Sequence, residues 1–250
     1  KTPLTLILSP LQRLIQQPQI SNNDKEKLEV IYRNANRMNY LINELLTFSK
    51  IEMKQMHISV RKGDIMHFLE ELSHIFDIVA GEREIDFIVS LEDTKEEVWF
   101  SPSKLERILY NLLSNAFKYT QPGGYVRLSA KLIKEEKETM VQISVKDSGR
   151  GIPKDVQEQI FESYYQVEKR DHREGFGLGL SLTRSLIHMH KGEIRVESEV
   201  NKGSDFIVTL NVSEDAYAPD ERSSENITTE EIQKYNQRIK ETIELIPEKL

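Results

Sequence analysis

The 250-residue sequence contains no cysteine and no hydrophobic run long enough to cross a membrane. The lack of cysteine excludes disulfides and thiolate metal sites, and it fits a reducing compartment. The apolar runs are short and interrupted by charges, and the N-terminus lacks the basic-then-apolar layout of a secretory signal. We therefore expect these residues neither to insert into a membrane nor to be exported.

Two common enzyme motifs and an excess of positive charge are also missing. The sequence has neither a Gly-x-x-x-x-Gly-Lys-Ser/Thr loop nor a Gly-x-Ser-x-Gly elbow, so a nucleotide site would belong to another fold. The net charge of −7 argues against a general nucleic-acid binder, and we expect no contact with DNA. The six histidines lack metal-site spacing, and we interpret them as structural: His57, His67, His74, His172, His188 and His190.

The first 50 residues predict two helices joined by a short loop. Apolar residues recur three and four positions apart in residues 1–18 and again in residues 24–50, where they form a heptad seam. One hairpin cannot cover its own apolar stripe, so we expect a homodimer through residues 1–50 that forms a four-helix bundle. The alternative is packing on the following domain of the same chain. The seam residues are Leu28, Ile31, Ala35, Met38, Ile42 and Leu45.

Beyond about residue 52 the pattern changes to short strands and separate helices. Alternation predicts strands at 57–60, 85–89, 126–132, 141–145, 192–197 and 206–212, and helical spacing predicts helices at 64–75, 102–119 and 181–190. This mixture predicts an α+β fold in which the long hairpin precedes a two-layer α/β sandwich. The predicted domains are residues 1–52, 53–212 and 213–250.

The C-terminal part divides into a polar linker and a helix. Residues 213–226 are rich in acids and serines, so we expect them to pack weakly. Residues 228–246 recover helical spacing, with Thr228 and Glu231 placed as a capping box. This helix could dock onto the chain, pair with a second copy or lead into a further domain, and the sequence leaves all three open.

The predicted helix at 102–119 carries polar residues suited to a phosphate and a metal ion. Asn111 and Asn115 are four positions apart, so they lie on one face, and Lys118 follows three residues later. An amide oxygen suits the oxygen-rich shell of Mg²⁺, and the lysine ammonium suits a phosphate oxygen. We predict that all three reach one ligand; the alternative for Asn115 is a structural role.

Two glycine-rich stretches follow that helix. Asp147 ends a predicted strand, and its carboxylate can accept a hydrogen bond from an exocyclic amine such as that of adenine; the alternative is a turn-capping carboxylate. A Cβ at Gly149 or Gly151 would occupy the volume of the ligand, so we expect the backbone to approach the base there. Residues 175–180 open into a helix whose N-terminal N–H groups suit phosphates.

Residues 153–174, between the glycine stretches, form a charged span with three aromatic residues. We interpret this span as a mobile lid with an apolar latch. The alternative is that the aromatic residues belong to the core. They are Phe161, Tyr164 and Tyr165.

In their order, these motifs resemble the ATP-binding domain of sensor histidine kinases, whose superfamily also holds DNA gyrase and the mismatch-repair and chaperone ATPases. The resemblance covers roughly residues 1–212. Residues 111–119 are similar to the N box, 147–152 to the first glycine box, 161–165 to the F box, 175–180 to the second glycine box, and 202–204 to the last box. The resemblance implies that ATP and Mg²⁺ bind at Asn111, Asn115, Lys118, Tyr119, Asp147, Gly149, Gly151, Ile152, Gly175, Gly177, Leu178, Gly179, Leu180 and Ser204.

The same resemblance implies individual roles. Asn115 would hold Mg²⁺ and Lys118 would contact phosphate. Tyr119 would flank the adenine, and Asp147 would bind its amine. Hydrolytic relatives place a glutamate where this sequence has Asn111, so attack by water lacks a general base and transfer to an external nucleophile is favoured. The candidates for the γ-phosphate, where many relatives carry an arginine, are Gln166, Lys169, Arg170 and Arg173.

Residues 1–4 look like the tail of the family's motif His-Glu-x-(Lys/Arg)-Thr-Pro. By that match the phosphoacceptor histidine precedes Lys1, so we expect this chain to bind ATP without phosphorylating itself. Thr2 matches the position that the family uses to orient water when it dephosphorylates its response regulator.

The resemblance further implies a receiver domain of a response regulator as partner, a membrane anchor in the full-length protein, and a cytoplasmic location. Residues 213–219 are similar to the linker of hybrid kinases. The competing interpretation is a non-catalytic, dimeric ATP-binding module that only reports whether its pocket is occupied. A third, an ATP-hydrolysing relative, would require a general base at position 111.

Overall fold

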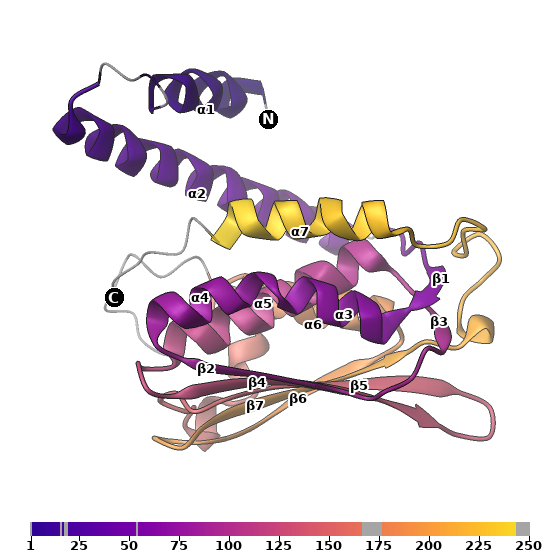
Figure 1. The fold of residues 1–250 in the computed structure, drawn as a ribbon. Helices are drawn as coiled ribbons and strands as arrows, with labels where there is room; N and C mark the ends of the chain where they lie inside the picture. The colour runs from indigo at the N-terminus through magenta and orange to yellow at the C-terminus, as the bar shows by residue number, and fades with distance from the viewer. Residues whose placement is uncertain (1, 16, 18–19, 54, 167–176, 244–250) are drawn as a thin grey trace.

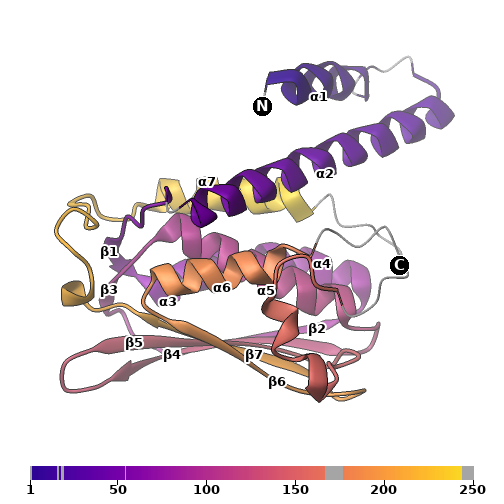
Figure 2. The same ribbon diagram turned by 180° about the vertical axis from the view of Figure 1, so that it is seen from behind.

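A computed structural model describes residues 2–15, 17, 20–53, 55–166 and 177–243. The chain forms three parts that follow one another in space: a helical hairpin, a layer of shorter helices, and a sheet (Figure 1). The hairpin lies on the far side of the helix layer from the sheet, and the view from behind shows the same order (Figure 2). This arrangement confirms the predicted α+β fold.

The hairpin consists of α1 (Thr2–Ile15) and α2 (Asn22–Glu52). Ser21 caps α2, because its side chain accepts a hydrogen bond from the backbone N–H of Asp24. Both helices match the predicted pattern. None of the helices among the described residues is long and apolar enough to span a membrane.

A five-stranded sheet forms the opposite face of the molecule, in the order β2-β4-β5-β7-β6. Strands β2 and β4 run parallel, and the other neighbours are antiparallel. A second, two-stranded sheet pairs β1 with β3. The strands are β1 (Arg61–Asp64), β2 (Asp86–Leu91), β3 (Glu97–Phe100), β4 (Tyr125–Lys134), β5 (Thr139–Asp147), β6 (Glu193–Glu199) and β7 (Gly203–Asn211).

Four helices cover one face of the large sheet, and a fifth lies outside them (Figure 1). The inner four are α3 (Ile65–Ser73), α4 (Ile75–Arg83), α5 (Pro102–Tyr119) and α6 (Gly179–Met189). The outer helix, α7 (Thr229–Ile243), packs on α3, α4 and α5. Short 3-10 turns occupy Lys154–Val156, Gln159–Phe161 and Glu214–Ala216.

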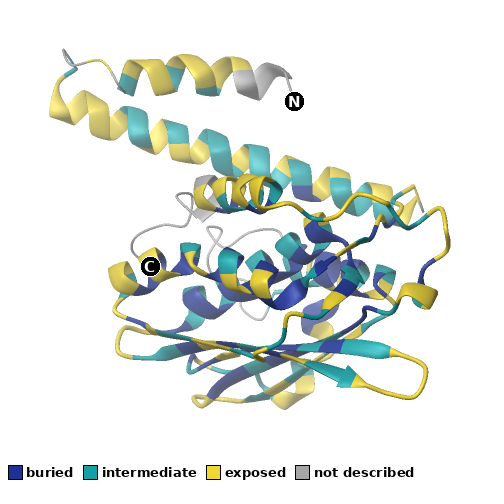
Figure 3. Cartoon of the chain, turned by 45° about the vertical axis from the view of Figure 1, so that its right-hand side comes forward, coloured by how far each residue is buried: buried dark blue, intermediate teal, exposed yellow. Residues whose placement is uncertain are grey.

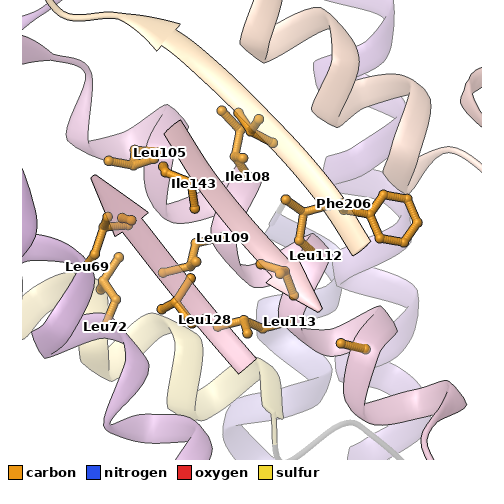
Figure 4. Packing of buried hydrophobic residues seen from close by; sticks show 14 of the residues in the cluster. Leu69, Leu72, Leu105, Ile108, Leu109, Leu112, Leu113, Leu128, Ile143 and Phe206 are labelled. Carbon is orange, nitrogen blue, oxygen red and sulfur yellow. The ribbon is translucent and has the colours of Figure 1, made fainter. Parts of the chain in front are cut away.

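The hydrophobic core lies between the helix layer and the sheet, where buried residues gather in Figure 3. Helix α5 supplies its centre, because its apolar side chains face the sheet (Figure 4). Proline at the start of α5 is tolerated because the first-turn N–H groups have no partner within the helix. The central residues are Leu105, Ile108, Leu109, Leu112 and Leu113 of α5, with Leu128, Ile143 and Phe206 of the sheet.

The predicted elements differ from the structure in three places. The first strand lies at 61–64 rather than 57–60, because Val60 makes only an isolated bridge to Arg222. The helix predicted at 64–75 is two helices that meet at His74. Strand β3 was not predicted, because its four residues give too short a pattern to recognise.

The segment after β7 packs more closely than its polar composition predicts. Tyr217 is buried, and its hydroxyl donates to the carbonyl oxygens of Asn211 and His190. Helix α7 buries Ile232 and Ile239 against the helix layer, so it docks onto its own chain. The expectation of weak packing for residues 213–226 is therefore wrong at Tyr217, although most of these residues are exposed, and the first of the three alternatives for the last helix is correct. The domain limits 1–52, 53–212 and 213–250 stay a prediction.

Candidate functional site

Asn111 joins the predicted N box to the second glycine box. Its side-chain Nδ2 donates to the carbonyl oxygen of Gly179 at 3.2 Å and to Oγ1 of Thr183 at 3.1 Å. Both partners lie in the first turn and a half of α6. Asn111 is only 4% exposed, and its Oδ1 accepts from the hydroxyl of Tyr40 at 3.1 Å. These contacts hold the helix of the N box against the helix that follows the second glycine box.

Asp147 closes strand β5 with a buried carboxyl group that is 4% exposed. Its Oδ1 accepts a hydrogen bond from the backbone N–H of Gly149 at 2.8 Å. Burial raises the pKa of Asp147 to about 6, while hydrogen bonds from the backbone N–H groups of Gly149 and Ser204 act against that rise. A buried carboxylate that keeps accepting capacity is suited to a neutral amine donor. The alternative, a carboxylate that caps a turn, is also correct in part, because this carboxylate accepts the hydrogen bond from the Gly149 N–H.

The glycines of the first box are required by the chain's own backbone. A Cβ on Gly149 would lie 2.5 Å from the carbonyl oxygen of Tyr119, and one on Gly151 would lie 2.0 Å from that of Glu199. Gly151 also has a φ of 68°, in the left-handed region. The expected reason, space for a ligand, is therefore not needed to explain these residues. Close packing of Gly149 on Tyr119 does bring the first glycine box against the end of the N box.

The end of the N box carries an aromatic ring that lies close to two cations. The Lys118 ammonium lies 4.9 Å from the centre of the Tyr119 ring, and the Arg150 guanidinium lies 4.6 Å from it. Such contacts orient a ring and concentrate positive charge beside it. The sequence reasoning missed Arg150, although its place inside the first glycine box was a usable signal.

The last box supports the first through a hydroxyl network. Ser198 Oγ lies 3.0 Å from Ser204 Oγ, and it accepts from the backbone N–H of Ile152 at 2.8 Å. Gly203 has a φ of 99°, and a Cβ there would lie 1.9 Å from the carbonyl oxygen of Asp147. Strand β7 can therefore lie close to Asp147 only with glycine at this place.

The described part of the second glycine box lies against the F box. Gly177 has a φ of 69°, and a Cβ there would lie 2.6 Å from the carbonyl oxygen of Tyr165. Helix α6 then begins at Gly179, with Leu178 buried before it and Leu180 packed against the core. The N-terminus of α6 therefore lies directly after the described part of the second glycine box, and its role toward a phosphate stays a prediction.

The three aromatic residues of the F box divide between the two interpretations. Phe161 is buried and packs edge-on against Phe206, as a core residue does. Tyr165 packs partly against the same core. Tyr164 is 60% exposed, and its ring lies edge-on to Phe48 of α2 with centroids 6.1 Å apart. Only Tyr164 is placed to act as a latch between the lid and the hairpin.

A cavity of about 520 Å³ lies between α2 and the second glycine box. Residues of the hairpin and of the F box line this cavity, and Asp147 is not among the lining residues. Its lining residues are Asn34, Arg37, Met38, Leu41, Ile42, Leu45, Tyr164 and Leu178.

The structure does not describe the surroundings of several predicted residues. Gly175 and the lid cations Lys169, Arg170 and Arg173 fall outside the described residues, and the surroundings of the Thr2 side chain are not described. Asn115 is partly buried one turn after Asn111 on α5.

Among the described residues, no cluster of three or more histidine, aspartate or glutamate side chains could hold a metal ion. His190 is structural: Nε2 accepts from the Ser101 N–H, and burial lowers its pKa to about 4.

Packing of the hairpin on the following domain, the alternative left open by the sequence, is present at α2, but the residues that make it were not predicted. Tyr40 and Glu44 are four residues apart on one face of α2, and Arg107 of α5 donates to Thr47 at 2.8 Å. The spacing of Tyr40 and Glu44 indicates a polar face of α2, but it does not indicate which residues that face contacts. Only the docking of α2 on α5 and α6 shows what they contact.

Two family models match the sequence. Residues 1–54 match the His Kinase A (phospho-acceptor) domain. Residues 100–214 match the histidine kinase-, DNA gyrase B- and HSP90-like ATPase. The two matched ranges contain the hairpin and all of the predicted site residues.

Curated relatives and solved structures agree with these matches. The chain is 34% identical to "Histidine kinase P4" of Formosa agariphila over 93% of its own length and 17% of the relative. It is 36% identical to the sensor histidine kinase TmoS of Ectopseudomonas mendocina (87% and 22%) and 32% identical to WalK of Bacillus subtilis (86% and 35%). The chain therefore spans about a third or less of these three relatives.

Two solved structures share the fold. Full-length ShkA in complex with AMPPNP superposes with a TM-score of 0.72 at 24% identity, over 85% of this chain and 44% of that one. The nucleotide-free catalytic domain of ThkA superposes with a TM-score of 0.54 at 25% identity, over 62% of this chain and 99% of that one.

Proposed function

Because the chain belongs to the family of two-component sensor histidine kinases, we propose that it is the catalytic core of such a kinase. It binds Mg²⁺-ATP and transfers the γ-phosphate to a histidine, from which a response-regulator aspartate takes it. The observation that carries this proposal is the assembly of the N box with both glycine boxes. Asn111 is bonded to Gly179, and Gly149 packs on Tyr119.

The base end of the proposed site is formed around Asp147. Its carboxylate accepts the adenine amine, and its burial beneath the first glycine box excludes water from that hydrogen bond. Tyr119 flanks the base, and its ring is contacted by Lys118 and Arg150. Ile152 and the Ser204 turn complete the support of this end.

The phosphate end is formed by α5 and the start of α6. The N-terminal N–H groups of α6, which begins with Gly179 and Leu180 directly after Gly177 and Leu178, face the phosphates. Lys118 contributes a positive charge. Mg²⁺ fits Asn115, because a partly exposed amide oxygen is a hard, neutral ligand, and the ion would neutralise phosphate charge there. Asn111 contacts the nucleotide when its oxygen is released from Tyr40.

The hairpin serves as the dimerisation element of the proposed kinase. Its helices expose large apolar residues in the structure, as an unpartnered bundle face does. Thr2 would orient water for dephosphorylation of the regulator. Membrane anchoring of the whole protein, a receiver domain as its partner and a cytoplasmic location follow from the family resemblance. The exposed residues include Leu6, Ile7, Leu14, Ile31, Met38, Ile42 and Leu45.

The proposal is tested by nucleotide binding and by labelling. Calorimetry with Mg²⁺-ATP should detect binding by the wild type, a loss of about 10- to 100-fold in Asp147→Asn, and no change in Asp86→Asn, an exposed aspartate on β2. The chain should acquire no acid-labile label from γ-labelled ATP, whereas a longer form that includes the upstream motif should acquire it. Binding that is absent, or indifferent to Asp147, would favour the non-catalytic module; label on the chain itself would contradict the missing-acceptor prediction.

A further inference from the structure

One contact of the hairpin with the proposed nucleotide site is a hydrogen bond from a tyrosine of α2. The Tyr40 hydroxyl lies 3.1 Å from Oδ1 of Asn111 and 3.0 Å from Oε1 of Glu44. The Tyr40 ring also packs edge-on against Tyr110 of α5, with centroids 6.1 Å apart. This contact joins α2 to a residue of the N box, 71 positions later in the sequence.

The amide of Asn111 has little freedom in this arrangement. Its Nδ2 carries two hydrogens, and they are directed at the Gly179 carbonyl and the Thr183 hydroxyl. The contacts with α6 therefore fix which way the amide points, and its oxygen faces α2. That oxygen accepts through two lone pairs, and the hydrogen bond from Tyr40 occupies one of them, so Tyr40 competes for it with a nucleotide or its metal.

The Tyr40 hydroxyl has one hydrogen and two acceptors. When Glu44 is ionised, its carboxylate is the stronger acceptor and takes the hydrogen, so Asn111 is held weakly. When Glu44 is protonated, its O–H can donate to Tyr40, whose hydrogen then goes to Asn111. Burial raises the pKa of Glu44, whereas the charge of Arg107 and the Tyr40 hydrogen bond act to lower it. Burial, together with Glu44, also raises the pKa of Tyr40, so its hydroxyl remains a donor.

We propose that Tyr40 is a positioning residue for Asn111, through which the docked hairpin lowers the affinity of the ATPase domain for nucleotide. The inference rests on the proposed function, because it takes Asn111 as a nucleotide-binding residue. Coupling of this kind is reciprocal, so bound nucleotide weakens the hold of Tyr40 on the ATPase domain. The hairpin thereby becomes freer to move when ATP is present.

Tyr40→Phe and Glu44→Gln test the proposal in opposite directions. Phenylalanine keeps the ring that packs on Tyr110 and removes only the hydroxyl, so Mg²⁺-ATP should bind about two- to tenfold more tightly. Glutamine cannot compete as an anion, and its amide can donate to Tyr40. The hydrogen of Tyr40 then goes to Asn111, and binding should weaken about two- to fivefold.

The measurements are dissociation constants of the full chain by calorimetry, for wild type, both single variants and the double variant. The double variant should bind like Tyr40→Phe, because Glu44 acts only through the hydroxyl. Tyr32→Phe, which removes a hydroxyl from a partly buried tyrosine on the same helix, should bind like the wild type. The side-chain amide resonance of Asn111 should shift in Tyr40→Phe and stay in place in Tyr32→Phe.

The outcomes separate the two proposals. Equal or weaker binding by Tyr40→Phe overturns the inference and leaves the proposed function intact. An effect of Glu44→Gln that persists without the hydroxyl also overturns it, since Glu44 would then act directly. Absence of binding by every form overturns the proposed function and the inference with it.

Discussion

Helices α2 and α5 have similar apolar stripes but opposite surroundings. The apolar stripe of α5 packs against the sheet of the same chain, so Leu105, Leu109 and Leu113 are fully buried (Figure 4). Much of α2 is exposed or only partly buried (Figure 3), and its seam residues Ile31 and Met38 are half exposed or more. The comparison teaches that the ATPase domain completes its core within one chain, whereas the hairpin needs a further surface.

The largest expected effect is a core truncation on α5. Leu109→Ala should cost about 2–5 kcal/mol of unfolding free energy, because it leaves a cavity that the layer of helices cannot fill. The matched change Leu46→Ala, at a 47% exposed position on α2, should cost less than about 1 kcal/mol. Urea unfolding followed by the fluorescence of Trp99, the single tryptophan, reports the ATPase domain directly. Equal costs at both sites would break the comparison.

The second largest effect concerns assembly. Ile31→Asp places a charge in the exposed seam of α2, so the dimer should dissociate about 100-fold more readily because each carboxylate would lose its water. Sedimentation equilibrium measures the change. Trp99-detected unfolding should remain as in the wild type, which separates loss of the dimer from loss of the fold. An unchanged dimer would show that the seam lies elsewhere.

The third effect is a pH dependence at the buried end of the site. Since burial raises the pKa of Asp147 to about 6, the carboxylate that we propose accepts a hydrogen bond from the adenine amine is lost below that pH. ATP affinity should be constant from pH 8 to pH 7. Below pH 6 it should decrease, and the decrease should approach tenfold for each pH unit. Calorimetry across this range checks it, and Asp147→Asn should bind weakly at every pH.

The same group affects stability with the opposite sign. Between its ordinary pKa and about 6, the folded chain holds a proton on Asp147 that the unfolded chain has released. This contribution therefore destabilises the fold as pH rises through that window. Asp147→Asn should remove that part of the pH dependence.

The smallest effect concerns the docking of α7. Arg61 donates to both carboxylate oxygens of Glu231 at 2.9 and 2.8 Å. Burial alone would raise the pKa of Glu231, but the hydrogen bonds from Arg61 and Thr228 hold it below its ordinary value. Glu231→Gln should cost about 1 kcal/mol at neutral pH, discounted for partial exposure.

The stabilisation by Glu231 has a defined pH window. Because the folded pKa is lowered, the contribution is present above the ordinary value and is lost as pH falls through the folded value. Unfolding of wild type and Glu231→Gln should therefore converge in acid. A constant difference between them at all pH values would contradict the ion pair as the cause.

Long periodic elements were predictable because their signals are local. Helix α5 was predicted at its observed limits, since Pro102 and a sustained apolar stripe mark it. Strands β4 and β5 were also predictable, because apolar and polar residues alternate on both sides of a charged turn. Strand β3 and the division of α3 from α4 were missed, because short elements are set by their partners rather than by their own pattern.

The candidate site shows the same division. Residue type and order predict the chemistry of Asp147, Asn115 and Lys118, and this stays a prediction. Why Gly149 and Gly151 must be glycine was not, because their neighbours Tyr119 and Glu199 lie far off in the chain.

The sequence alone determined the hairpin, the order of the boxes and the types of residue that they offer to a ligand. These depend on spacing along the chain, which folding does not change. Only the tertiary structure decided that α7 docks on its own chain and that Tyr40 faces Asn111. Such contacts join residues distant in sequence, and their energies arise from burial and hydrogen-bond geometry that no local pattern contains.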